Sequence, residues 1–123
     1  MHKNERLIWF KGDMVSIENA KINVLSPTSQ FGANVFEGLR AYWNASEKQL
    51  YVFRLSEHID RLQNSIKMIE FEVAFTNAFL QQSVIDIIQA NNFQEDVVCR
   101  QTIFLDGFGN WSATGPAEMF IAP

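Results

Sequence analysis

Hydrophobic and polar residues alternate in short blocks near the start of the chain, and this pattern predicts two hairpins. Apolar residues 7–10 and 14–15 flank a polar turn, which is typical of two short antiparallel strands. Residues 35–43 and the returning residues 49–55 repeat the arrangement around a second polar turn. The first half of the chain is therefore expected to contribute strands to a sheet.

The last quarter of the chain also predicts strands. Residues 97–105 are apolar with little alternation, which indicates a strand buried on both faces. A glycine-punctuated loop at 106–110 follows, and residues 117–122 begin a further strand. Near the start, residues 20–25 are expected to form a loop or an irregular strand, closed by Ser26 and Pro27.

Between these strands, apolar residues recur every three or four positions, the spacing of a helix that faces a core. Ser56 is the expected N-cap of the first helix, and Thr76 or Asn77 of the second. The first stripe consists of Ile59, Leu62, Ile66 and Ile69. The second stripe consists of Phe79, Leu80, Val84, Ile87 and Ile88, and the helix is expected to close at Asn91 and Asn92. The order of elements predicts an α+β fold, a small and mainly antiparallel sheet with two helices packed on it.

Composition narrows the class of protein. A chain of 123 residues predicts one domain, and a net charge of −4 argues against nucleic-acid binding. Cys99 is the only cysteine, so no internal disulfide can form, and with only His2 and His58 we expect no metal site. A cysteine in an apolar strand is commonly a buried small hydrophobe, so Cys99 is not expected to be a nucleophile.

Two features of the sequence, its polar start and the length of its apolar runs, indicate where in the cell the protein is expected. Residues 1–6 are polar with no apolar run behind them, so we expect no signal peptide. No apolar run has the length that a bilayer span requires. A cytoplasmic protein is the expectation.

Arg61 is the first candidate for chemistry. On a helix whose apolar stripe faces inward, Arg61 lies on the opposite side together with His58. Arginine gives planar, multidentate recognition of phosphate. The alternative from spacing alone is a solvated helix face, on which Glu57 and Arg61 form an ordinary ion pair one turn apart.

Strand alternation places Phe36, Gly38 and Arg40 on one face of the strand at 35–43. These residues could line a pocket for an amphipathic ligand, or they could be a core phenylalanine, a glycine bulge and an edge arginine. Arg100 interrupts the apolar strand at 97–105, where a buried charge would need a partner. That partner could be a carboxylate of the protein or of a ligand.

Three linked segments resemble the fold-type IV pyridoxal-phosphate enzymes, and most closely the branched-chain amino acid aminotransferases. They are WFKG at 9–12, FGANVFEGLRAY at 31–42 and FRLSEHIDRLQNS at 53–65. Their order and spacing are similar to those of the family, and the likeness continues to the strand of Arg100. Phe31 and Val98 stand where the family commonly has tyrosine, and Gln101 where proline often follows the arginine.

The resemblance implies a role for each candidate. Arg61 would hold the phosphate of the cofactor, pyridoxal 5′-phosphate. Phe36 and Gly38 would help to form the pocket for the substrate side chain, which Arg40 would help to shape. Arg100 would meet the distal carboxylate of glutamate or 2-oxoglutarate. The implied activity is transfer of an amino group between a branched-chain L-amino acid and 2-oxoglutarate.

The same resemblance predicts what lies outside residues 1–123. In the family, the lysine that binds the cofactor lies in a second, larger domain, and no lysine here matches that context, so residues 1–123 are expected to be one small N-terminal domain without catalytic residues, inactive alone. The loop near residues 106–111 and the region of Phe31 reach toward a partner subunit in the family, which implies a homodimer. The alternatives are a domain like that of D-amino acid aminotransferases or aminodeoxychorismate lyases, or a dimerising module without catalysis.

Overall fold

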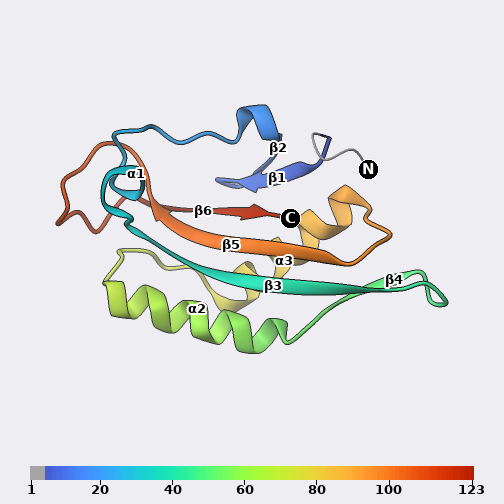
Figure 1. Ribbon diagram of the computed structural model, residues 1–123. Coiled ribbons are helices and arrows are strands. Elements are labelled where there is room, and N and C mark those ends of the chain that lie inside the picture. Colours follow the sequence, from blue (N-terminus) through green and yellow to red (C-terminus); the bar gives the residue numbers. More distant parts are fainter. Residues whose placement is uncertain (1–4) are drawn as a thin grey trace.

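The computed structural model describes residues 5–123 and shows the predicted α+β fold (Figure 1). Its elements in chain order are β1 (Leu7–Phe10), β2 (Asp13–Ser16), a 3₁₀ turn at Ile17–Asn19, α1 (Pro27–Phe31), β3 (Asn34–Asn44), β4 (Gln49–Val52), α2 (Leu55–Ile69), α3 (Asn77–Asn91), β5 (Val97–Leu105) and β6 (Ala117–Ala122). Both predicted hairpins are present, as β1–β2 and β3–β4.

Six strands form a single sheet in the order β2-β1-β6-β5-β3-β4, and every neighbouring pair is antiparallel. The last strand, β6, is inserted between β1 and β5, so the end of the chain lies in the middle of the sheet (Figure 1). The predicted antiparallel sheet is therefore confirmed, and its two longest strands, β3 and β5, pair with each other from Asn34 to Ala41 of β3.

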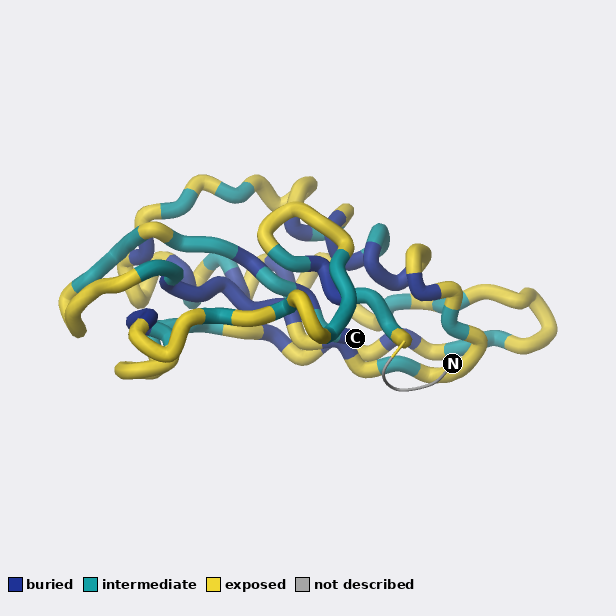
Figure 2. Tube along the Cα trace, turned by 90° about the horizontal axis from the view of Figure 1, so that it is seen from above, coloured by how far each residue is buried: buried dark blue, intermediate teal, exposed yellow. Residues whose placement is uncertain are grey.

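The two long helices cover one face of this sheet. In Figure 1, α2 runs along β3 and α3 lies behind the sheet. Buried segments gather in the interior, whereas the loops at both ends of the molecule are exposed (Figure 2). Burial of apolar side chains, which removes their surface from water, is the main favourable contribution to folding. The core includes Leu39, Ile59, Leu62, Leu80, Val84, Ile87, Ile103, Met119 and Ile121.

The predicted helices are confirmed, with corrections at their ends. Thr76 caps α3 by accepting a hydrogen bond from the backbone of Phe79, and Asn92 follows the helix with a left-handed backbone. The N-cap of α2 is Arg54 rather than Ser56, because the chain leaves β4 through Arg54 in the left-handed region. The backbone N–H of His58 already donates to the carbonyl of Arg54. Ile69 is partly exposed because α2 ends immediately after it.

A short helix, α1, was not predicted from the sequence. Ser26 caps it by accepting a hydrogen bond from Ser29 N–H, and Pro27 occupies its first position, where a missing N–H costs nothing. Gly32 ends it in the left-handed region, with φ of 65°. The prediction that Ser26 and Pro27 only close a loop was wrong, because the same pair starts a helix.

The prediction that residues 97–105 are buried on both faces holds only for the second half of β5. Residues 101–105 are all buried, but Val98 and Arg100 are exposed. The strand partners of Arg100 are Gly38 and Ala122, two small residues, and neither long helix covers that face. None of the helices within residues 5–123 is both long and apolar enough to cross a membrane.

Replacing Asn91 by alanine is expected to lower the free energy of unfolding by about 2–3 kcal/mol. The buried Asn91 side chain accepts from Leu7 N–H at 2.7 Å and donates to the carbonyls of Leu7 (3.1 Å) and Ile87 (2.9 Å), so it joins α3 to β1. Urea titration measures the loss. The exposed neighbour Gln89 is the control, since Gln89→Ala should change little, and equal stability of the two variants would contradict the prediction.

Candidate functional site

Strand β3 separates the candidate residues onto two faces of the sheet. Glu37, Leu39 and Ala41 point toward the helices and are buried, whereas Phe36, Gly38 and Arg40 lie on the opposite, exposed face. The predicted alternation is therefore confirmed. Phe36 is half exposed, which contradicts the alternative of a core phenylalanine, and Gly38 pairs with Arg100 in regular register, so it is not a bulge.

One edge of β3 has no strand partner over half its length. Strand β4 pairs only with residues 41–44, and its continuation at Phe53 donates to the carbonyl of Arg40. Because backbone groups alternate in direction along a strand, the N–H and C=O groups of Phe36 and Gly38 point to the same edge, where no strand of the described chain pairs with them. A side chain added at Gly38 would meet no atom within 4 Å. This edge can therefore accept a group from outside residues 5–123.

Helix α2 brings Arg61 to the same stretch of β3 from the helix side. Its Nε donates to both carboxylate oxygens of Glu37 at 3.0 Å, and its Nη2 donates to Oε1 at 2.8 Å. The His58 Nδ1 lies 2.8 Å from the same Oε1. An ionised carboxylate only accepts, so Nδ1 carries the hydrogen of this bond. The Arg61 side chain is nevertheless 69% exposed, whereas the Glu37 side chain is 5% exposed.

The charges of this cluster stabilise one another. Burial alone would raise the pKa of Glu37, but the hydrogen bonds and charges of Arg61 and His58 outweigh burial and lower that pKa below its usual value. The Glu37 hydrogen bond and charge raise the pKa of Arg61. Both groups are therefore ionised at neutral pH, and the expected ion pair of Arg61 with Glu57 is replaced by one with Glu37.

Arg100 lies on the exposed face together with Phe36 and Arg40. Its guanidinium lies 4.5 Å from the centre of the Phe36 ring, a cation–π contact. Arg100 is exposed, so the expectation that its charge is buried was wrong, and it makes no ion pair within residues 5–123, which excludes the alternative of a carboxylate from this part of the chain. Its N–H groups are free to meet an anion on this face.

The structure thus brings the candidates together only in part. Arg100, Phe36, Gly38 and Arg40 share one face, whereas Arg61 reaches the buried side of β3. Glu37, its partner, stands between Phe36 and Gly38 in the strand. A ligand bound at the open edge of β3 could contact the residues of the exposed face as well as Arg61 on the helix side.

Two of the three positions at which the sequence departs from the resemblance are exposed, and the third is in the core. Val98 is opposite Arg40 and exposed, and Phe31, at the end of α1, is also exposed. Gln101 points into the core, where its Nε2 donates to the carbonyl of Leu80 at 3.0 Å. Cys99 is 1% exposed, and burial raises the pKa of its thiol to about 12, so it is not an activated nucleophile.

The loop between β5 and β6 carries two exposed aromatic side chains, Phe108 and Trp111. Lys11, in the β1–β2 turn, forms an ion pair with Asp106 at the start of this loop. Gly109 lies against α1, since a side chain there would meet Pro27 at 3.0 Å. Within residues 5–123, no group of three or more histidine, cysteine, aspartate or glutamate side chains is placed to hold a metal ion.

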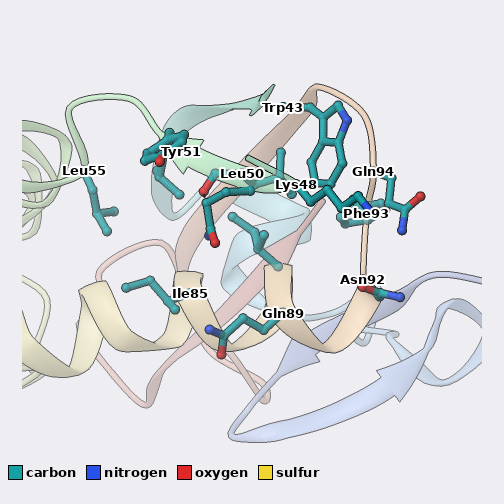
Figure 3. Close-up of a pocket in the computed structure, with 13 residues that line it drawn as sticks. Trp43, Lys48, Leu50, Tyr51, Leu55, Ile85, Gln89, Asn92, Phe93 and Gln94 are labelled. Atoms are coloured by element: carbon teal, nitrogen blue, oxygen red, sulfur yellow. Dashed lines mark hydrogen bonds between the residues drawn. The ribbon is translucent and has the colours of Figure 1, made fainter. Parts of the chain in front are cut away.

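A pocket of about 750 Å³ lies elsewhere, between the β3–β4 hairpin and α3 (Figure 3). Trp43 and Tyr51 line it from the hairpin, and Ile85 and Gln89 from α3. None of the candidate residues contributes to its walls. The pocket is therefore separate from the site built around β3.

Glu37 is the residue that sequence reasoning missed. It occupies an inward position in the alternation of β3, between positions that face the helices with apolar side chains. A carboxylate at such a position needs a partner, since an unpaired buried charge is costly. That signal, combined with the arginine on the neighbouring polar helix face, could have identified the pair.

Comparison with known proteins identifies the family of the chain. Residues 34–122 match the family model described as amino-transferase class IV. The chain is 38% identical, over 107 residues, to the branched-chain-amino-acid aminotransferase of Escherichia coli strain K12. That match covers 87% of this chain and 34% of the relative, so the chain spans about a third of that protein's length.

Solved structures give the same result. The branched-chain aminotransferase of Thermoproteus uzoniensis, solved with norvaline, superimposes with a TM-score of 0.88 and 39% identity, over 95% of this chain and 39% of that one. The branched-chain amino acid aminotransferase of Thermobaculum terrenum, solved in its pyridoxal-phosphate form, superimposes with a TM-score of 0.81 and 31% identity, over 98% of this chain and 40% of that one.

Proposed function

Because the chain belongs to the amino-transferase class IV family, we propose that it is the small N-terminal domain of a pyridoxal-phosphate-dependent aminotransferase. The complete protein would move the amino group between a branched-chain L-amino acid and 2-oxoglutarate. The observation that carries this proposal is the exposed Arg61, held beside β3 by its hydrogen bonds to Glu37. The relatives above are branched-chain aminotransferases, which favours this substrate class over D-amino acids.

The residues present fit the phosphate of pyridoxal 5′-phosphate. Glu37 occupies the Nε hydrogen of Arg61 and one hydrogen of Nη2, which leaves Nη1 and the second Nη2 hydrogen free. These free hydrogens lie in one plane, and guanidinium groups bind phosphate oxygens through such pairs of donors. Arg61 would therefore hold the phosphate.

When bound, pyridoxal phosphate supplies an electron sink for a substrate carbanion. The residues of this chain would position the reacting groups and would move no proton themselves. Phe36 and Gly38 would line the pocket for the substrate side chain, where the bare backbone of Gly38 leaves room. Arg40 would shape the pocket, and Arg100 would bind the distal carboxylate of 2-oxoglutarate through its free N–H groups.

The proposal includes parts outside residues 1–123. The lysine amine that the reaction requires would come from a second, larger domain, and residues 1–123 alone would have no activity. The exposed side chains of Phe31, Phe108 and Trp111 favour a homodimer in which this end of the domain meets the partner subunit. We place the enzyme in the cytoplasm.

The test is a reconstitution of the complete gene product with pyridoxal phosphate. We expect an absorbance band for the cofactor bound to a lysine, and transfer of the amino group from L-leucine, L-isoleucine or L-valine to 2-oxoglutarate. D-amino acids are the control substrates. Absence of cofactor binding, or turnover with D-amino acids alone, would contradict the proposal.

A further inference from the structure

We propose that Glu37 is a positioning residue, which fixes the guanidinium of Arg61 so that its free N–H groups face the phosphate of pyridoxal phosphate. This inference rests on the proposed function, because it requires Arg61 to bind that phosphate. It adds a second residue to the phosphate site, one that would act through Arg61 and touch neither cofactor nor substrate.

The first argument is the geometry of the pair. The Glu37 carboxylate accepts hydrogen bonds from Arg61 Nε at 3.0 Å and from Arg61 Nη2 at 2.8 Å, so it binds one complete edge of the guanidinium plane. A planar group held along one edge can turn only with difficulty, and its other edge is then directed away from the carboxylate. Glu37 therefore sets the direction in which Arg61 can donate.

The second argument is the rigidity of Glu37 itself. Its strand residue pairs with Gln101 of β5 in the interior of the sheet, and its side chain is almost fully buried. His58 approaches the same carboxylate at 2.8 Å and restricts it further. The carboxylate is therefore a fixed reference point for a side chain that projects from a neighbouring helix.

The third argument is the lack of any other anchor for Arg61. Its side chain is 69% exposed, and within residues 5–123 all its side-chain hydrogen bonds go to Glu37. A long exposed arginine without such a partner samples many rotamers, and binding an anion would then require ordering it first. The hydrogen bonds to Glu37 order the Arg61 side chain in the folded protein before the ligand binds.

Charge alone predicts the opposite effect, which makes the inference testable. Glu37 carries a negative charge near the proposed position of another anion, so simple Coulomb repulsion would make its removal strengthen phosphate binding. Loss of orientation would make its removal weaken binding. The sign of the change therefore separates the two effects.

The experiment measures how strongly the complete protein prefers pyridoxal phosphate over pyridoxal, as the ratio of the two dissociation constants. This ratio isolates the phosphate from the rest of the cofactor. We expect Glu37→Gln to reduce the preference by about tenfold, the effect of one charged hydrogen bond. Glu57→Gln is the matched control, because it removes the same charge from the exposed side of α2, and we expect no change or a slightly stronger preference.

Two further variants exclude a general structural effect. In an Arg61→Ala background, Glu37→Gln should no longer lower the preference and should raise it slightly, because nothing is left to orient and a repelling charge is removed. Glu37→Asp keeps the charge on a side chain one methylene shorter, so we expect it to reduce the preference as well; it also serves if Glu37→Gln does not fold.

The outcomes separate this inference from the proposed function. If Arg61→Ala abolishes the preference while Glu37→Gln and Glu37→Asp keep it, the positioning role is overturned and the phosphate site stands. An equal loss from Glu37→Gln with and without Arg61 would also overturn the positioning role. If Arg61→Ala leaves the preference intact, the proposed phosphate site itself fails.

Discussion

Replacing Arg61 by alanine is expected to weaken the binding of pyridoxal phosphate to the complete protein by about a hundredfold or more. The free edge of the guanidinium can form two charge-assisted hydrogen bonds with the phosphate, and each contributes about 1.5–3 kcal/mol. The substitution also leaves the buried carboxylate of Glu37 without its arginine, so a negative charge then faces the ligand. Both effects act in the same direction. Fluorescence titration of the cofactor-free protein measures the change.

The control for this prediction is Lys67→Ala, which removes the same charge from an exposed position of the same helix. We expect it to leave the affinity within about twofold, because exposed charges beyond the contact are screened by salt. Arg61→Lys should recover only part of the affinity, since an ammonium group cannot donate along one planar edge. Wild-type affinity in the alanine variant would show that Arg61 faces only solvent.

The sequence contained enough information to predict the elements around this site, and α2 shows why. Its stripe of Ile59, Leu62 and Ile66 is buried in the core, and Arg61 lies on the polar side as the 3.6-residue period requires. The start of the helix was misplaced because the left-handed residue Arg54 sets it, and single residues with positive φ leave only a weak signal when they are not glycine.

The site was predictable only as far as single elements define it. Alternation placed Phe36, Gly38 and Arg40 on one face, because the period of a strand is local. The pair of Glu37 and Arg61 joins residues 24 positions apart, and the packing of α2 against β3 creates it. No local pattern shows which helix covers which strand, so Glu57, one turn away from Arg61, was the nearer candidate.

The misassigned environment of Arg100 has a similar origin. An apolar strand in the middle of a sheet is expected to be buried on both faces, and that expectation needs side chains or helices on each face. Here both helices cover the same face, and the two cross-strand neighbours of Arg100 on the other face are Gly38 and Ala122. The guanidinium of Arg100 is therefore left exposed, in contact with the ring of Phe36.

The exposure of Arg100 leads to the second large expected effect. Replacing Arg100 by alanine should raise the KM of the complete enzyme for 2-oxoglutarate by about 10- to 100-fold, because the distal carboxylate loses a charge-assisted partner. The half-reaction with L-leucine should change much less, since that side chain carries no charge and meets the apolar part of the face. Steady-state kinetics with each substrate varied in turn measures the two effects separately.

Lys21→Ala supplies the charge control for this prediction, because Lys21 is an exposed cation outside every strand and helix. Arg100→Lys should give an intermediate KM, since it keeps the charge and loses the planar donors that also stack on Phe36. An equal loss with L-leucine and 2-oxoglutarate would mean that Arg100 supports the pocket as a whole through its contact with Phe36. An unchanged KM for 2-oxoglutarate would remove Arg100 from the substrate site, and the recognition of the second carboxylate would then have to come from outside residues 5–123.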